Sequence, residues 1–184
     1  MRATFFSILL AAALCAAASA AEPSTALPAA PWGVFSVASA GGTDRTEVEI
    51  ASVLIANTAG ARPETTWINE KSERVWVARK RVVKAGAADT VQWTDSRACY
   101  QLVETLATLT DLDQPAQTPI LSLDEPSDAG VVYHLQVAGA SAGRPRAIRL
   151  ANGRDVPVKV LVRSVLDGLG PCWSDAPPSL GANA

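Results

Sequence analysis

The stretch DVPVKVLVRSVLDGLGP, residues 155–171, decides the fold class of this chain. Its apolar residues recur at helical spacing and form one continuous face: Val158, Leu161, Val162, Val165, Leu166 and Leu169. Asp155 can cap the helix, Pro157 is tolerated in its first turn, and Gly170-Pro171 ends it. A helix that is apolar on one side must cover another layer, which the remaining chain has to provide. Because β-branched valines lower helix propensity, a strand at residues 156–162 stays open as the alternative.

A second helix is expected in the middle of the chain. Its apolar stripe consists of Cys99, Leu102, Val103, Leu106 and Leu109. The polar run at residues 94–96 offers side chains for the N-cap, and Pro115 and Pro119 follow the end of the stripe.

Alternation of apolar and polar residues predicts strands in most of the remaining chain. The expected strands are residues 32–38, 46–56, 65–69, 74–83, 90–93, 131–137 and 146–150. We expect the third and fourth of these to form a hairpin, and the last to pair with residues 131–137. The sequence therefore predicts an α+β fold, with an antiparallel sheet of about five to seven strands, two helices packed on one face and one disulfide.

The N-terminus predicts export. Arg2 precedes an apolar run at residues 5–14 that is too short to span a bilayer, and Ala18-Ser19-Ala20 offers small residues to signal peptidase. We therefore expect a signal peptide at residues 1–20, and a secreted or periplasmic protein with no transmembrane segment in its mature chain. Composition then predicts a Pro/Ala-rich linker at 21–31, a single globular α+β domain at 32–173 and a disordered tail at 174–184.

Two cysteines, Cys99 and Cys172, lie outside the expected signal peptide, which contains the third, Cys15. An even number of cysteines in an exported protein favours a disulfide. A zinc site needs about four ligands, whereas His134 is the single histidine of the chain. We expect a structural disulfide between Cys99 and Cys172, and neither a metal nor a cofactor.

One stretch matches a catalytic motif. Residues 139–143, GASAG, fit the G-x-S-x-G pattern that presents a nucleophilic serine, here Ser141. That motif requires a helix after the serine and a histidine later in the chain, but Pro145 follows Ser141 and His134 precedes it. We therefore expect a non-catalytic protein, and keep a small secreted hydrolase that uses Ser141 and His134 as the alternative.

Charge is distributed unevenly, although the net charge of −2 gives no general attraction to nucleic acid. Residues 98–143 contain no Lys or Arg and six acidic residues: Glu104, Asp111, Asp113, Asp124, Glu125 and Asp128. Residues 144–163 contain one acidic residue, Asp155, and six basic residues: Arg144, Arg146, Arg149, Arg154, Lys159 and Arg163. The two segments either pair with each other or leave the basic segment free to bind an acidic partner.

The candidate binding residues come from this basic segment and from two tryptophans on expected strands. They are Arg146, Arg149, Arg154, Lys159, Trp67 and Trp76. Tryptophans on exposed strands can anchor an interface, whereas those on half-buried strands fill the core. We expect a secreted or periplasmic binding protein whose partner is an acidic envelope component or an acidic protein, and not a nucleic acid.

Overall fold

The computed structural model of the chain describes residues 26–55, 73–110, 120–138, 147–149 and 154–180. Six antiparallel strands form one sheet in the order β4-β3-β2-β1-β6-β5. They are β1 (Gly33–Ser39), β2 (Arg45–Ile55), β3 (Glu73–Val83), β4 (Thr90–Asp95), β5 (Ile120–Pro126) and β6 (Val131–Ala138). Two short strands, β7 (Ile148–Arg149) and β8 (Asp155–Val156), pair with each other beside this sheet.

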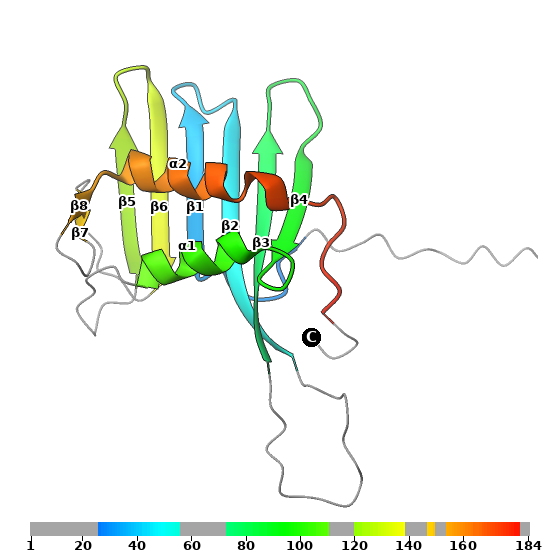
Figure 1. Cartoon of the computed structure of the whole chain (residues 1–184). Coiled ribbons are helices and arrows are strands. Elements are labelled where there is room, and N and C mark those ends of the chain that lie inside the picture. The colour runs from blue at the N-terminus through cyan, green and yellow to red at the C-terminus, as the bar shows by residue number, and fades with distance from the viewer. Residues whose placement is uncertain (1–25, 56–72, 111–119, 139–146, 150–153, 181–184) are drawn as a thin grey trace, which may run out of the picture.

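Two helices, α1 (Tyr100–Thr110) and α2 (Val158–Gly168), cross the same face of the sheet (Figure 1). A short 3-10 helix, η1 (Gly170–Cys172), follows α2. The expected fold is confirmed, because the chain forms an α+β structure with a six-stranded antiparallel sheet, two helices in contact with it and one disulfide.

The core lies between the sheet and the helices. The strand register places Phe35 of β1 next to Val48 of β2 and Leu135 of β6, and all three side chains are buried. Both helices bury their apolar stripes against this layer, α1 through Leu102, Leu106 and Leu109, and α2 through Val158, Leu161, Val162 and Val165. Each fully buried side chain of this size contributes about 1.5–3 kcal/mol, so helix packing fixes which face of the sheet is internal.

The pairing of β6 differs from the sequence prediction. Strand β6 pairs with β1 on one side and with β5 on the other. In the described part of the expected partner at residues 146–150, the strand is β7, which pairs with β8, so the prediction of pairing with residues 131–137 was wrong. Strand β5 was missed because its polar end at residues 124–126 resembles the start of the turn that follows. The expected strand at 65–69, and with it the hairpin to 74–83, lies outside the described residues.

The start of α2 also differs from the prediction. Asp155 belongs to β8, and Pro157 is the N-cap residue, with no side-chain cap bond. The β-branched residues therefore divide between two elements, because Val156 is in the short strand and Val158 begins the helix.

The disulfide joins Cys99 and Cys172, with Cα atoms 5.6 Å apart. Cys99 immediately precedes α1 and is 1% exposed, while Cys172 ends η1. The bond therefore ties the start of the first helix to the chain just after the second.

Part of the tail expected from residue 174 onwards belongs to the folded unit. Ser174 forms an antiparallel bridge with Trp93 of β4, and Leu180 packs against the buried side chains of Val75, Val77 and Trp93. Ser174 and Leu180 therefore contact the sheet, and the boundaries expected for the linker, the domain and the tail stay predictions. Residues 181–184 lie outside the described residues.

Asp95 stabilises the turn between β4 and α1 through hydrogen bonds to its carboxylate. Its Oδ1 accepts hydrogen bonds from the backbone N–H groups of Arg97 and Ala98, each at 2.9 Å, and its Oδ2 accepts one from the Arg97 guanidinium at 2.6 Å. Burial alone would raise the pKa of this carboxyl, but the bonds from Arg97 and Ala98 together outweigh burial and lower it. Asp95 is one of the three cap residues proposed from sequence, and it caps the turn that leads into the helix.

We expect Asp95→Asn to lower the free energy of unfolding by about 1–2 kcal/mol at pH 7. Since the folded protein depresses the pKa of Asp95, its contribution is present above the pKa of the unfolded state and is lost as pH falls below about pH 4. Denaturant unfolding between pH 3 and pH 7 measures this, and the variant should show a flatter acid limb. The control is Asp89→Asn, which breaks an exposed ion pair and should cost less than about 0.5 kcal/mol. Equal losses in both variants would contradict the assignment.

Candidate functional site

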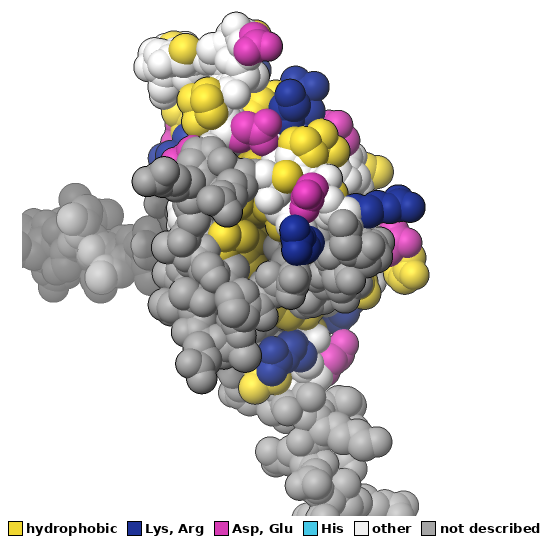
Figure 2. Space-filling view, turned by 90° about the vertical axis from the view of Figure 1, so that its left-hand side faces the viewer, with side chains coloured by type: hydrophobic (Ala, Val, Ile, Leu, Met, Phe, Trp, Pro, Cys, Tyr) yellow, Lys and Arg dark blue, Asp and Glu magenta, His cyan; other side chains and the backbone are white. Residues whose placement is uncertain are grey.

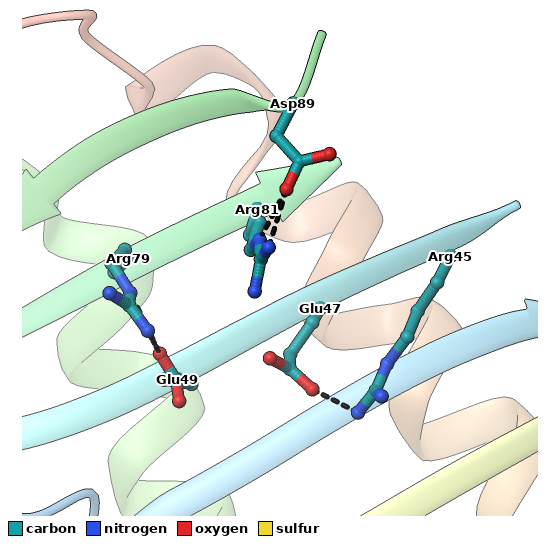
Figure 3. A network of polar contacts seen from close by, with 6 residues as sticks. All are labelled: Arg45, Glu47, Glu49, Arg79, Arg81 and Asp89. Carbon is teal, nitrogen blue, oxygen red and sulfur yellow. Dashed lines mark hydrogen bonds and ion pairs between the residues drawn. The ribbon is translucent and has the colours of Figure 1, made fainter. Parts of the chain in front are cut away.

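The face of the sheet that the helices leave open carries a network of ion pairs (Figure 3). The β2–β3 register places Glu49 opposite Arg79 and Glu47 opposite Arg81. The Arg79 Nε donates to Glu49 at 2.7 Å, the Arg81 Nε donates to Asp89 at 2.8 Å, and Arg45 bonds Glu47. Each guanidinium in this network thus already faces a carboxylate, and the face is balanced in charge. It offers little attraction to a strongly acidic or strongly basic partner.

A Ser-His-Asp row crosses the same open face. Strand register aligns Asp124 of β5 with His134 of β6, and His134 with Ser36 of β1. The His134 Nδ1 lies 2.6 Å from Oδ1 of Asp124, which holds the imidazole in one orientation. Ser36 is only 3% exposed, and no hydrogen bond joins it to His134 in the described part of the chain. A serine nucleophile must be accessible and bonded to its base, so this row does not form a working triad. Ser141, the serine of the sequence motif, lies outside the described residues.

The structure describes one of the two candidate tryptophans, Trp76. Trp76 lies on the helix-facing side of β3, where it packs against the core and meets Trp32 edge to face, with ring centroids 5.4 Å apart. Its backbone N–H donates to the Ser96 Oγ at 3.1 Å. Trp76 is therefore a half-buried residue that packs against the core. Trp67 lies outside the described residues.

Three of the four candidate basic residues lie at one corner of the molecule, which we call the basic corner: Arg149, Arg154 and Lys159. Arg149 is on β7, Arg154 precedes β8, and Lys159 is in the first turn of α2, all beside the β5 edge (Figure 1). Arg146 lies outside the described residues. Figure 2 views this side of the molecule, where the described Lys and Arg side chains lie among Asp and Glu side chains.

Weak pairing leaves the charges of the basic corner available. The Arg149 side chain is 67% exposed, and its Nε lies 3.7 Å from the Asp155 carboxylate, beyond a good hydrogen bond. Within the described ranges, the side chains of Arg154 and Lys159 have neither an ion pair nor a hydrogen bond. Arg163, the other basic residue of α2 beyond this corner, is engaged instead, because its Nε donates to the Tyr133 hydroxyl at 2.9 Å.

The neighbouring acidic residues of β5 use their carboxylates elsewhere. Glu125 of β5 accepts a hydrogen bond from the backbone N–H of Lys159 at 3.0 Å, and so caps α2 in place of a side chain from the helix itself. Asp124 bonds His134. Of the two sequence-based alternatives, mutual pairing of the acidic and basic segments is therefore not seen among the described side chains of this corner.

A groove of about 180 Å³ lies between the two helices. Its apolar floor includes Leu109, Leu161 and Val165, and its one charged lining residue is Glu104. An acidic partner does not fit a groove whose charge is negative. Among the described residues, no three His, Cys, Asp or Glu side chains are grouped to hold a metal, and no helix is long and apolar enough to cross a membrane.

Comparison of the chain with protein-family models, with curated proteins and with solved structures found no match in any of the three.

The cap on α2 gives a prediction. Glu125→Ala should lower the free energy of unfolding by about 0.5–2 kcal/mol, because the first turn of α2 loses its carboxylate partner. The control is Asp128→Ala, which removes an exposed carboxylate from the neighbouring turn and should change stability by less than about 0.5 kcal/mol. Thermal unfolding and hydrogen exchange of the Lys159 amide measure the effect. An unchanged exchange rate for that amide in Glu125→Ala would contradict the cap.

Proposed function

We propose that this protein is a secreted or periplasmic, non-catalytic binding protein that docks an acidic partner on its basic corner. The observation that carries the proposal is the availability of three exposed cations there: Arg149 approaches the Asp155 carboxylate only to 3.7 Å, and the Glu125 carboxylate bonds the backbone of α2. Exposed charges attract an oppositely charged partner and speed the encounter with it.

The expected export of the chain agrees with the kind of partner proposed. A signal peptide at residues 1–20 would deliver the protein to an oxidising compartment, where disulfides persist, and the structure contains the Cys99–Cys172 bond. Acidic polymers and acidic proteins of the cell envelope are available in that location. The proposed partner is therefore an acidic envelope component or an acidic protein.

Charge reversal at the basic corner tests the proposal. With polyglutamate as the probe, Arg154→Glu should weaken binding by about three- to tenfold at low salt and flatten its salt dependence. The matched control is Lys84→Glu, which makes the same change in net charge at an exposed turn after β3. Both variants should keep their free energy of unfolding within about 0.5 kcal/mol. Equal weakening by both variants would show that only the net charge matters and would reject the corner as the site.

A small secreted hydrolase that uses Ser141 and His134 is the second candidate, favoured by one contact, the 2.6 Å approach of Asp124 to His134. A carboxylate on Nδ1 is the partner that orients a catalytic histidine. The two functions make different predictions for a serine-reactive fluorophosphonate.

We expect no labelling of the protein by a fluorophosphonate, since a binding protein has no activated serine. Mass spectrometry measures the adduct, and a known serine hydrolase serves as the positive control. An adduct that disappears in both Ser141→Ala and His134→Ala would instead establish the hydrolase.

A further inference from the structure

The C-terminal residues Ser174–Leu180, which we call the strap, wrap around the outer edge of the sheet at β4 (Figure 1). The strap begins next to Trp173, whose ring lies 4.9 Å from the Lys80 Nζ on the helix-facing side. It ends with Leu180 on the open face, against Val75, Val77 and Trp93. The strap therefore passes from one face of the sheet to the other.

The strap binds β4 as a short added strand. Ser174 and Trp93 exchange two backbone hydrogen bonds, Trp93 N–H to the Ser174 carbonyl at 2.7 Å and Ser174 N–H to the Trp93 carbonyl at 2.9 Å. Side chains add two bonds, from the Gln92 amide to Asp175 at 3.1 Å and from the Arg97 guanidinium to the Ser179 carbonyl at 2.9 Å. Backbone pairing with pockets for alternate side chains is how sheet edges recognise extended peptides.

Few contacts hold the strap in place. Ser174, Asp175, Ala176, Pro177 and Ser179 are all exposed, and Leu180 is its one large apolar residue. Pro177 and Pro178 lack backbone N–H groups, so the strap cannot extend its pairing along β4. The disulfide at Cys172 fixes the root of the strap, and a released strap would stay near its site at high effective concentration.

We propose that the outer edge of β4, together with the apolar cluster of Val75, Val77 and Trp93, is a docking site for an extended peptide, and that the strap is its displaceable cover. The contacts of the strap indicate which peptide chemistry fits this site. A ligand needs an extended residue to pair with Trp93, a carboxylate directly after it near Gln92, and an aliphatic side chain for the place of Leu180. Burial lowers the pKa of Lys80, while the negative charge of Asp175 raises it. A carboxylate at the position of Asp175 therefore also stabilises the protonated form of Lys80. This site lies at the opposite sheet edge from the basic corner and does not depend on it.

The test releases the strap in the full-length, oxidised protein. The variant Ser174→Pro/Leu180→Asp removes one backbone donor and the apolar contact, whereas Ala176→Asp adds a charge at an exposed strap position and is the matched control. The probe is the peptide WSDAPPSL, which copies residues 173–180, and its binding is followed through the NMR shift of the Trp93 amide. A probe with Asp in place of its final Leu controls for specificity.

We expect the released variant to bind the peptide at least about tenfold more tightly than the wild type or Ala176→Asp, because the tethered strap competes with the free peptide. The Asp-ended probe should bind at least about tenfold more weakly. A folded released variant with no gain in peptide binding would overturn the proposal. Should the double variant fail to fold, Leu180→Asp alone is used in the same comparison.

Two further measurements bear on the proposal. In the wild type, the Trp93 amide should exchange with deuterium faster than core amides of β1, because the strap opens locally; exchange only at the rate of global unfolding would overturn the displaceable cover. Sedimentation of the released variant should show a monomer. A dimer would overturn the peptide site in favour of pairing with a second copy of this chain.

Discussion

The disulfide between Cys99 and Cys172 is the constraint on which the arrangement of the other parts depends. It fixes three things at one point near the β4 end of the sheet: the start of α1, the end of the segment that contains α2, and the root of the strap. In the chain-entropy model, a disulfide that closes a loop of 73 residues lowers the entropy of the unfolded chain and so stabilises the folded state by about 4 kcal/mol. With both helices tethered there, their apolar stripes pack on one face of the sheet, and the other face carries the charged pairs and the apolar cluster of Val75, Val77 and Trp93.

Elements with a clear local pattern were predictable from sequence. The stripe of α2 and the alternation of β6 are complete within their own residues, so both were found close to their true bounds. Strand β5 was not, because only Leu121 and Leu123 alternate before its acidic end, and its identity as a strand depends on pairing with β6. The same limit explains the wrong partner for β6. Neighbouring strands in the sheet are chosen by tertiary packing, which local periodicity does not encode.

The surfaces were predictable in part. Sequence located the basic residues, but their availability depends on Glu125 bonding a backbone N–H rather than a cation, which composition does not reveal. On β3, Val75 and Val77 share a face with Arg79 and Arg81, so the strand pattern alone could not assign an inner side. The apolar half of that open face is covered by Leu27 and Leu180, which lie far away in the sequence. Trp76 is on the other side of the strand and packs against the core, a contact that also depends on residues far away in the sequence.

The two ends of the sheet have a consequence for the behaviour of the protein at high concentration. An uncovered edge strand offers unpaired backbone groups that recruit other chains into aggregates. At one end the strap occupies Trp93 of β4; at the other, β5 ends in Asp124, Glu125 and Pro126. Two such β5 edges brought together would repel each other through their carboxylates, and the proline cannot donate to a shared ladder. The sheet is therefore protected at both ends against growth into fibrils, by a covering segment at β4 and by charge and proline at β5.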